Sequence, residues 1–179
     1  NLREALEIDS DALVIGCVGR GAPVKNYPLL AKAAGELSLR RKTVLLIVGA
    51  VEESLKAQMI SYAKSARVLF VGQQKDTNQF YRIMDVFALA SFFESSSIVT
   101  VEAQLSGVPC VISDRISKEV VISDGVVQCS PEESAEKWAD TIELTATKAI
   151  STIDLERFDF QNAMKSLRRI YYEMAGKME

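Results

Sequence analysis

Short, continuous apolar runs alternate with amphipathic segments along most of this chain. Uninterrupted apolar runs are typical of strands buried on both faces of a parallel sheet, whereas half-buried strands alternate apolar and polar residues. Three of the runs end at a glycine, namely Gly19, Gly49 and Gly72. The pattern predicts strands at residues 12–18, 43–48, 68–71, 86–90, 109–112 and 126–129.

The amphipathic segments between these runs predict helices at residues 26–39, 52–64, 78–84, 99–106 and 134–145, followed by a long terminal helix at 154–177. In the first of them, Asn26 is placed to cap the helix and Pro28 suits the first turn. The helix at 52–64 is expected to turn Leu55, Met59, Ile60 and Ala63 inward. Trp138 in the helix at 134–145 is expected to be a packing residue.

Repeated strand–helix units require right-handed crossovers, which place helices on both faces of the sheet. We therefore predict an α/β fold with a doubly wound, Rossmann-like parallel sheet. No repeat or linker divides the chain, so residues 1–179 are expected to form one domain. Residues 149–152 are the only candidate hinge.

The amino-acid composition excludes several classes of function. The chain has 179 residues, 48% of them hydrophobic, and a net charge of −3, so the whole molecule does not attract nucleic acid or anionic lipid. It has no histidine, which removes histidine-based acid–base chemistry and most zinc sites. The three cysteines (17, 110 and 129) are expected to be buried thiols in a reducing compartment. Because the chain opens on Asn1 and an interior-like segment, we expect it to be part of a longer protein.

Two carboxylates, Glu94 and Glu102, flank a short polar loop between a predicted strand and a predicted helix. Open α/β sheets bind phosphorylated ligands at this kind of junction. Glu94 is expected at the carboxyl end of the strand, and Glu102 one turn inside the helix, facing the same crevice. Both acids could instead have only a structural role at the end of the helix. Residues 95–97 are all serine, and could be a helix-capping cluster or could bind an anion.

Two cations follow the first predicted strand. Arg20 comes directly after Gly19, and Lys25 lies in the same loop, so both suit a diphosphate, Arg20 as a planar clamp and Lys25 as a point charge. Both could also be solvated surface charges. The basic residues 40–42 follow a predicted helix end, where cations complement the helix dipole, and we interpret them as structural.

These motifs together resemble the C-terminal, nucleotide-binding half of retaining family 4 glycosyltransferases of the GT-B type, which have two Rossmann-like domains. The resemblance covers nearly the whole chain and is closest to bacterial capsular polysaccharide and exopolysaccharide transferases. Its motifs, in family order, are Gly19-Arg20, Lys25-Asn26, Val48-Gly49, Val71-Gly72, Asp85-Val86, the pair Glu94 and Glu102, and Gly107-Val108-Pro109. Ser95 stands where the family usually has glycine, which implies an altered loop and donor preference.

The resemblance implies a role for each matching position. Gly19, Arg20 and Lys25 would bind the donor diphosphate, Glu94 the donor sugar and Glu102 the ribose hydroxyls. The backbone around Gly72 and Gln73 would meet the base, and the amides of Ser97, Ile98 and Val99 the phosphates and sugar. Glu94, Arg20 and Lys25 would be the catalytic residues.

The implied function is retaining transfer of a sugar from a nucleoside diphosphate sugar to a saccharide or lipid-linked acceptor. No metal or other cofactor and no nucleic-acid partner are expected. The acceptor would bind an N-terminal domain absent from this chain, and the chain alone would be inactive. The expected location is the cytoplasm, with peripheral contact to the inner face of the membrane. Two alternatives stay open: a nucleotide-sugar epimerase of the same architecture, and a non-catalytic nucleotide-binding domain.

Overall fold

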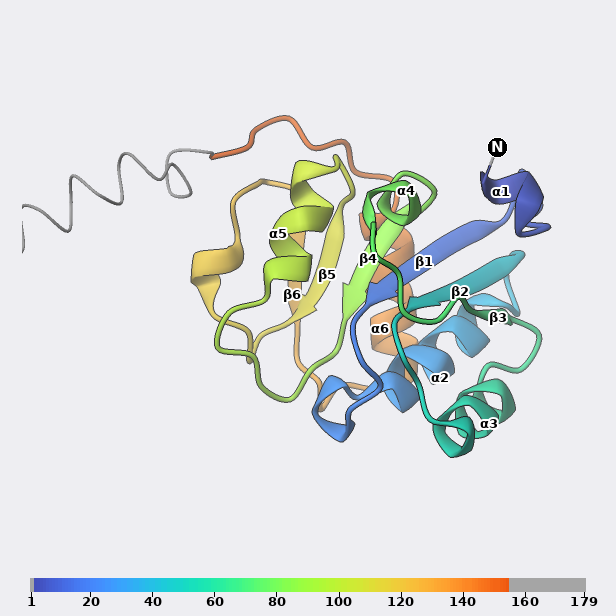
Figure 1. The fold of residues 1–179 in the computed structure, drawn as a ribbon. Coiled ribbons are helices and arrows are strands. Elements are labelled where there is room, and N and C mark those ends of the chain that lie inside the picture. The colour runs from blue at the N-terminus through green and yellow to red at the C-terminus, as the bar shows by residue number, and fades with distance from the viewer. Residues whose placement is uncertain (1, 155–179) are drawn as a thin grey trace, which may run out of the picture.

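The computed structural model describes residues 2–154, so the predicted terminal helix lies outside the described residues except for its first position. Six strands form one sheet in the order β3-β2-β1-β4-β5-β6 (Figure 1). Every neighbouring pair is parallel, which confirms the doubly wound prediction. The strands are β1 (Leu13–Val18), β2 (Thr43–Val48), β3 (Arg67–Phe70), β4 (Val86–Leu89), β5 (Cys110–Ser113) and β6 (Val126–Cys129).

Helices cover both faces of the sheet. Helices α2, α3 and α6 lie on one face, where α2 packs against both of the others, and α5 covers β4 and β5 on the opposite face (Figure 1). The sequence pattern did not predict α1 or the two short 3-10 helices, η1 and η2. The helices are α1 (Leu2–Ala5), η1 (Pro23–Lys25), α2 (Tyr27–Leu37), α3 (Glu53–Tyr62), α4 (Asn78–Tyr81), α5 (Ile98–Leu105), η2 (Lys118–Val120) and α6 (Ala135–Thr145).

Two local predictions are wrong. Ile60 is 58% exposed, and Met59 is the only buried residue within α3. Ile60 lies about 100° around the helix from Met59 and so faces water. Asn26 occupies the N-cap position of α2, but its side chain makes no capping bond. Its φ of +51° is left-handed, whereas a capping side chain needs an extended backbone.

The core is formed mainly by the four central strands, β1, β2, β4 and β5, which are buried along their whole length. Trp138 is fully buried as expected, and its indole N–H donates to the carbonyl of Ser130 at 2.8 Å. All three cysteines are free, and their predicted burial is confirmed. Burial raises the pKa of the Cys17 thiol to about 12, so this thiol stays protonated and serves packing.

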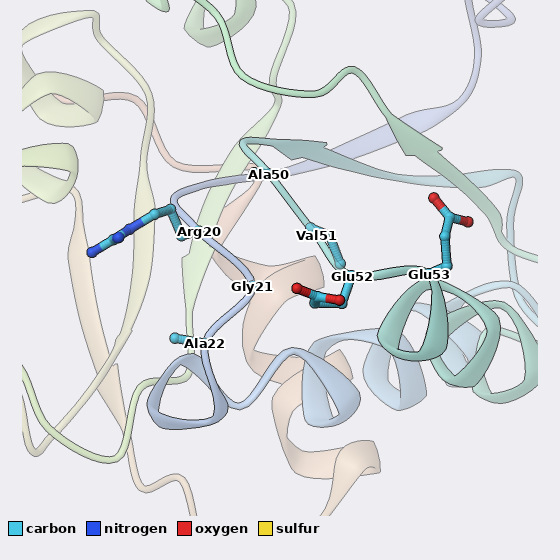
Figure 2. Close-up of a pocket in the computed structure, with 7 residues that line it drawn as sticks. All are labelled: Arg20, Gly21, Ala22, Ala50, Val51, Glu52 and Glu53. Carbon is cyan, nitrogen blue, oxygen red and sulfur yellow. The ribbon is translucent and has the colours of Figure 1, made fainter.

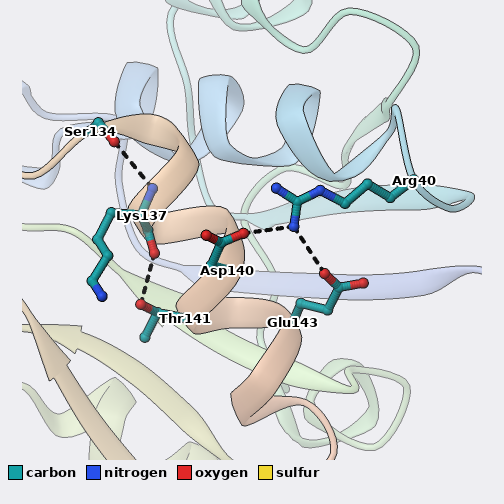
Figure 3. Close-up of polar contacts among 6 residues, drawn as sticks. All are labelled: Arg40, Ser134, Lys137, Asp140, Thr141 and Glu143. Carbon is teal, nitrogen blue, oxygen red and sulfur yellow. Dashed lines mark hydrogen bonds and ion pairs between the residues drawn. The ribbon is translucent and has the colours of Figure 1, made fainter.

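Within residues 2–154, two of the three basic residues at positions 40–42 form ion pairs with acidic side chains. Arg40 binds Asp140 and Glu143 of α6, at 2.6 and 3.2 Å (Figure 3). These carboxylates raise the pKa of Arg40. Lys42 pairs with Asp9 and Asp11. The structural interpretation of this run is therefore confirmed for Arg40 and Lys42.

A hydrogen bond and an ion pair connect neighbouring segments at the amino end of the sheet. The Asp85 carboxylate accepts the backbone N–H of Val14 at 2.7 Å and pairs with Arg3 at 2.9 Å. This contact fixes the start of β4 beside β1.

No helix among residues 2–154 is long and apolar enough to cross a membrane.

Candidate functional site

The loops that follow β1 and β4 meet at the carboxyl edge of the sheet. From β1 the chain proceeds outward to β2 and β3 on one side, whereas β4 leads to β5 and β6 on the other. Ligands of doubly wound sheets bind where the strand order reverses in this way. The N–H of Phe92 donates to the carbonyl of Val24 at 2.8 Å, so the two loops are in direct contact at this point.

Lys25 and Glu94 form an ion pair across this contact. Their side chains are only 17% and 16% exposed, respectively. Ser91 donates a further hydrogen bond to the same carboxylate oxygen at 3.0 Å. A charge this far from water is costly unless it is paired, so the pair fixes both side chains at the junction. The interpretation of Lys25 as a solvated surface charge is therefore wrong.

Glu94 lies further from its strand than the sequence suggested. Strand β4 ends at Leu89, and Glu94 follows within the loop at the same edge. A bridge to Ile116 supports it from the loop after β5. The prediction is right about the edge of the sheet and wrong about the strand terminus, because the loop continues past the strand before α5 begins.

Arg20 is exposed beside a cleft of about 560 Å³ at the same edge (Figure 2). In Figure 2 its guanidinium points away from Glu52 and Glu53, and among residues 2–154 it forms no ion pair. Among residues 2–154, Arg20 is thus an unpaired cation in the same connection as the paired Lys25. The cleft is lined by Arg20, Gly21, Ala22, Ala50, Val51, Glu52 and Glu53.

Glu102 is on α5, where it is held by a residue from another element. The hydroxyl of Tyr81 donates to Glu102 Oε2 at 2.8 Å and also contacts the carbonyl oxygen of Val99 at 3.2 Å. Glu102 is half-buried. It lies in the second turn of α5, which begins at Ile98, so the predicted position inside the helix is confirmed.

Free N–H groups mark the beginning of α5. The first N–H groups of a helix have no carbonyl one turn earlier to bind. Within residues 2–154 we find no acceptor for the N–H groups of Ser97, Ile98 or Val99. Ser97 holds the N-cap position, but its hydroxyl bonds that of Thr100 at 2.8 Å and caps no N–H. The capping interpretation of the serine cluster is therefore wrong for Ser97, and these amides are available to an anion.

Glycines let the loops at this edge approach closely. Gly49 has a φ of +142°, and a Cβ there would lie 2.0 Å from the carbonyl oxygen of Gly19. The N–H of Gly49 donates to the carbonyl of Gly72 at 2.8 Å, and Gly72 has a φ of +69°. These contacts place Gly72 and the exposed Gln73 next to the loops that follow β1 and β2.

The structure thus brings the predicted residues to one edge in two contact groups, Lys25 with Glu94 and the start of α5 with Glu102. Sequence reasoning missed Tyr81 and Ser91, for which no local pattern exists. It also missed Glu52 and Glu53 at the cleft. Their position just after a strand-ending glycine is the signal that could have found them.

Comparison with known proteins adds the family. A family model described as "Glycosyl transferases group 1" matches residues 1–156. This chain belongs to that family. The protein EpsF of Bacillus subtilis (strain 168) is 36% identical over 148 residues, covering 78% of this chain and 38% of EpsF. A D-inositol 3-phosphate glycosyltransferase of Saccharomonospora viridis is 30% identical, over 96% of this chain and 45% of the relative.

Solved structures show the same fold. HepE of Anabaena, crystallised with UDP, superimposes with a TM-score of 0.69 at 23% identity, over 99% of this chain and 51% of HepE. Sucrose-phosphate synthase of Thermosynechococcus elongatus gives a TM-score of 0.72 at 19% identity, over 96% of this chain and 48% of the synthase. The fold is that of one Rossmann-like unit of a GT-B glycosyltransferase. The chain spans less than half the length of the two curated relatives named above.

Proposed function

We propose that this chain is the donor-binding domain of a retaining glycosyltransferase that uses a nucleoside diphosphate sugar. The observation that carries the proposal is the ion pair between Lys25 and Glu94, which joins a cation and an acid from two loops at the point where the strand order reverses. The family match supports a transferase over the epimerase alternative. The neighbour HepE was crystallised with UDP and with UDP-glucose, which supports this class of ligand.

In this proposal the diphosphate binds between the loop after β1 and the beginning of α5. Arg20 and Lys25 neutralise the charge that grows on the diphosphate as the bond to the sugar breaks, and the amides of Ser97, Ile98 and Val99 donate to its oxygens. Donors that are already in place act without reorganisation at that moment. No metal or other cofactor has a role in this scheme.

The two acids divide the remaining work. Glu94 contacts the sugar, where its charge favours the positively charged transition state over the neutral ground state. Glu102 accepts from the ribose hydroxyls, which do not react. The backbone at Gly72 and Gln73 meets the base.

The acceptor is proposed to bind a second domain that precedes this chain in a longer protein. The chain covers 38% of EpsF, which leaves room in such a relative for another domain of this size. A saccharide or lipid-linked acceptor in exopolysaccharide or capsular synthesis fits that relationship. The enzyme would then work in the cytoplasm, at the inner face of the membrane.

The test compares the two acids. Glu94→Gln, measured in the intact enzyme, is expected to keep near-normal affinity for the nucleoside diphosphate and to lose most transfer activity. Glu102→Ala is expected to weaken binding of nucleotide and nucleotide sugar alike. Isothermal titration beside a steady-state assay separates the two effects. The matched control is Glu143→Gln, which removes the charge of an acid on α6 that pairs with Arg40. It should change neither the nucleotide affinity nor the turnover.

Two results would contradict the proposal. If Glu94→Gln retains full turnover, Glu94 does not act on the sugar. If the intact enzyme binds nucleoside diphosphate sugars and transfers nothing, the chain is a non-catalytic nucleotide-binding domain, the alternative that the serine run at residues 95–97 suggests.

A further inference from the structure

Tyr81 is a buried phenol whose hydroxyl contacts α5 of the proposed donor site at two oxygens, Glu102 Oε2 and the carbonyl oxygen of Val99. It is the last residue of α4, and its side chain is fully buried. The ring lies 6.2 Å from that of Phe87 in β4, centroid to centroid. Its hydroxyl reaches α5, where it donates to Glu102 Oε2 at 2.8 Å. Phenylalanine would fill the same space, so packing alone does not require the hydroxyl.

The hydrogen bond from Tyr81 occupies only one of the two carboxylate oxygens of Glu102. Oε2 is occupied by Tyr81, whereas among residues 2–154 no donor binds Oε1. Burial and the neighbouring carboxylate raise the pKa of Tyr81. The phenol therefore remains a neutral donor at physiological pH. It also lies 3.2 Å from the carbonyl oxygen of Val99, in the first turn of α5.

The position of Tyr81 in the chain connects two parts of the site. Helix α4 is the first element after Gly72 and Gln73, and α5 carries Glu102. The hydrogen bond therefore joins the element that follows the proposed base-binding segment to the acid proposed for the ribose. A carboxylate on a half-buried helix has several rotamers, and a bond to one oxygen restricts them.

We propose that Tyr81 is a positioning residue that holds Glu102 through Oε2, so that Oε1 is presented to a ribose hydroxyl of the donor. The inference rests on the proposed function, because it requires Glu102 to bind ribose. It adds a residue that does not touch the donor and that sets the orientation of one that does.

The experiment measures how much of the binding depends on ribose hydroxyls. UDP and its 2′,3′-dideoxy analogue are titrated calorimetrically into the full chain and into Tyr81→Phe. The ratio of the two affinities reports the ribose contact. Tyr81→Phe is expected to weaken UDP binding about five- to tenfold, the loss of part of a charge-assisted bond, and to leave the dideoxy analogue unchanged. A merely structural role would weaken both ligands equally.

Two further variants complete the design. Tyr62→Phe removes the same oxygen from a half-buried tyrosine on α3, whose ring lies under the Lys32 ammonium, and should change neither affinity. Glu102→Ala is expected to abolish the difference between UDP and the analogue. Adding Tyr81→Phe to Glu102→Ala should then have no further effect, since the hydroxyl acts only through this carboxylate.

The outcomes separate the two hypotheses. If Glu102→Ala reduces the affinity ratio and Tyr81→Phe does not, the positioning role is overturned and the ribose role of Glu102 stands. If Glu102→Ala leaves the ratio intact, the ribose contact in the proposed function is itself wrong. If Tyr81→Phe weakens UDP to the same extent in the Glu102→Ala background, the hydroxyl acts independently of Glu102 and the inference fails.

Discussion

At the residue scale, the two cations proposed for the diphosphate differ in their surroundings. Lys25 is already held by Glu94 and is mostly buried, so little side-chain freedom is left to lose when a ligand binds. Arg20 is exposed, and among residues 2–154 it has no acidic partner. Lys25 is thus preorganised, whereas Arg20 has to be ordered by the ligand. The two residues should contribute differently to binding and to specificity.

Replacing Arg20 with alanine should weaken binding of UDP about ten- to hundredfold and leave uridine nearly unchanged, because a hydrogen bond to a charged group contributes about 1.5–3 kcal/mol. Calorimetric titration of both ligands measures this. Arg41→Ala is the matched control, since it removes the same charge from an exposed site near the start of β2. Equal losses for uridine and UDP would show that Arg20 does not contact phosphate.

Replacing Lys25 with alanine should also weaken UDP binding, and it should destabilise the fold as well. The change leaves the Glu94 carboxylate, 16% exposed, without its cation. An uncompensated buried charge is strongly destabilising. Urea unfolding of Lys25→Ala beside Arg20→Ala tests the difference, and equal midpoints for the two variants would contradict it.

At the element scale, the side chain of Gln104 hydrogen-bonds α5 to the loop after β5. The Gln104 amide is fully buried, and both its nitrogen and its oxygen form hydrogen bonds. Its Nε2 donates to the carbonyls of Thr100 and Val120, at 2.9 and 2.8 Å. Its Oε1 accepts from the N–H of Ile122 and the hydroxyl of Ser123, at 2.9 and 3.0 Å. This amide therefore ties the segment around η2 to the helix that carries Glu102.

Gln104→Leu is expected to lower the free energy of unfolding by about 2–4 kcal/mol, because several buried polar groups lose their partner at once. Urea denaturation measures the change. Gln79→Leu, on the exposed side of α4, is the control and should stay within about 0.5 kcal/mol. A loss for Gln104→Leu no larger than that of the control would mean that water replaces the amide.

At the scale of the whole molecule, the proposed site lies on one open edge of the sheet. Exposed apolar side chains gather in the loops at that edge, including Phe92 and Phe93, which are 52% and 66% exposed. The cleft beside Arg20 is open to solvent rather than enclosed. A donor bound at this open edge of the sheet would be only partly enclosed by this chain, so binding should be weak and water should reach the reacting bond.

The chain alone is therefore expected to bind UDP weakly and to transfer no sugar. Ligand at 100 times its dissociation constant should stabilise the fold by about 2.7 kcal/mol, which appears as a rise in the unfolding temperature. A thermal-shift series with UDP, GDP and ADP, run beside a transfer assay with labelled donor, measures both properties. Sugar transfer by this chain without any other domain would overturn the two-domain proposal.

The sequence by itself determined which segments form strands and which end in loops at the ligand-binding edge. Continuous apolar runs are local signals of burial on both faces, and they placed the strand boundaries within one residue of those observed. Residues directly after strand ends, such as Arg20, followed from the same signal. The order of motifs around Glu94 and Glu102 added the family.

The tertiary structure decided which of these side chains meet. Lys25 and Glu94 are 69 positions apart, and Tyr81 and Glu102 are 21 apart. Their contacts depend on β1 and β4 being neighbours and on the side of the sheet that α5 covers. Hydrophobic periodicity carries no information about either, because it reports only whether a residue faces core or water. The exposure of Ile60 was decided in the same way, by the position of α3 against the sheet.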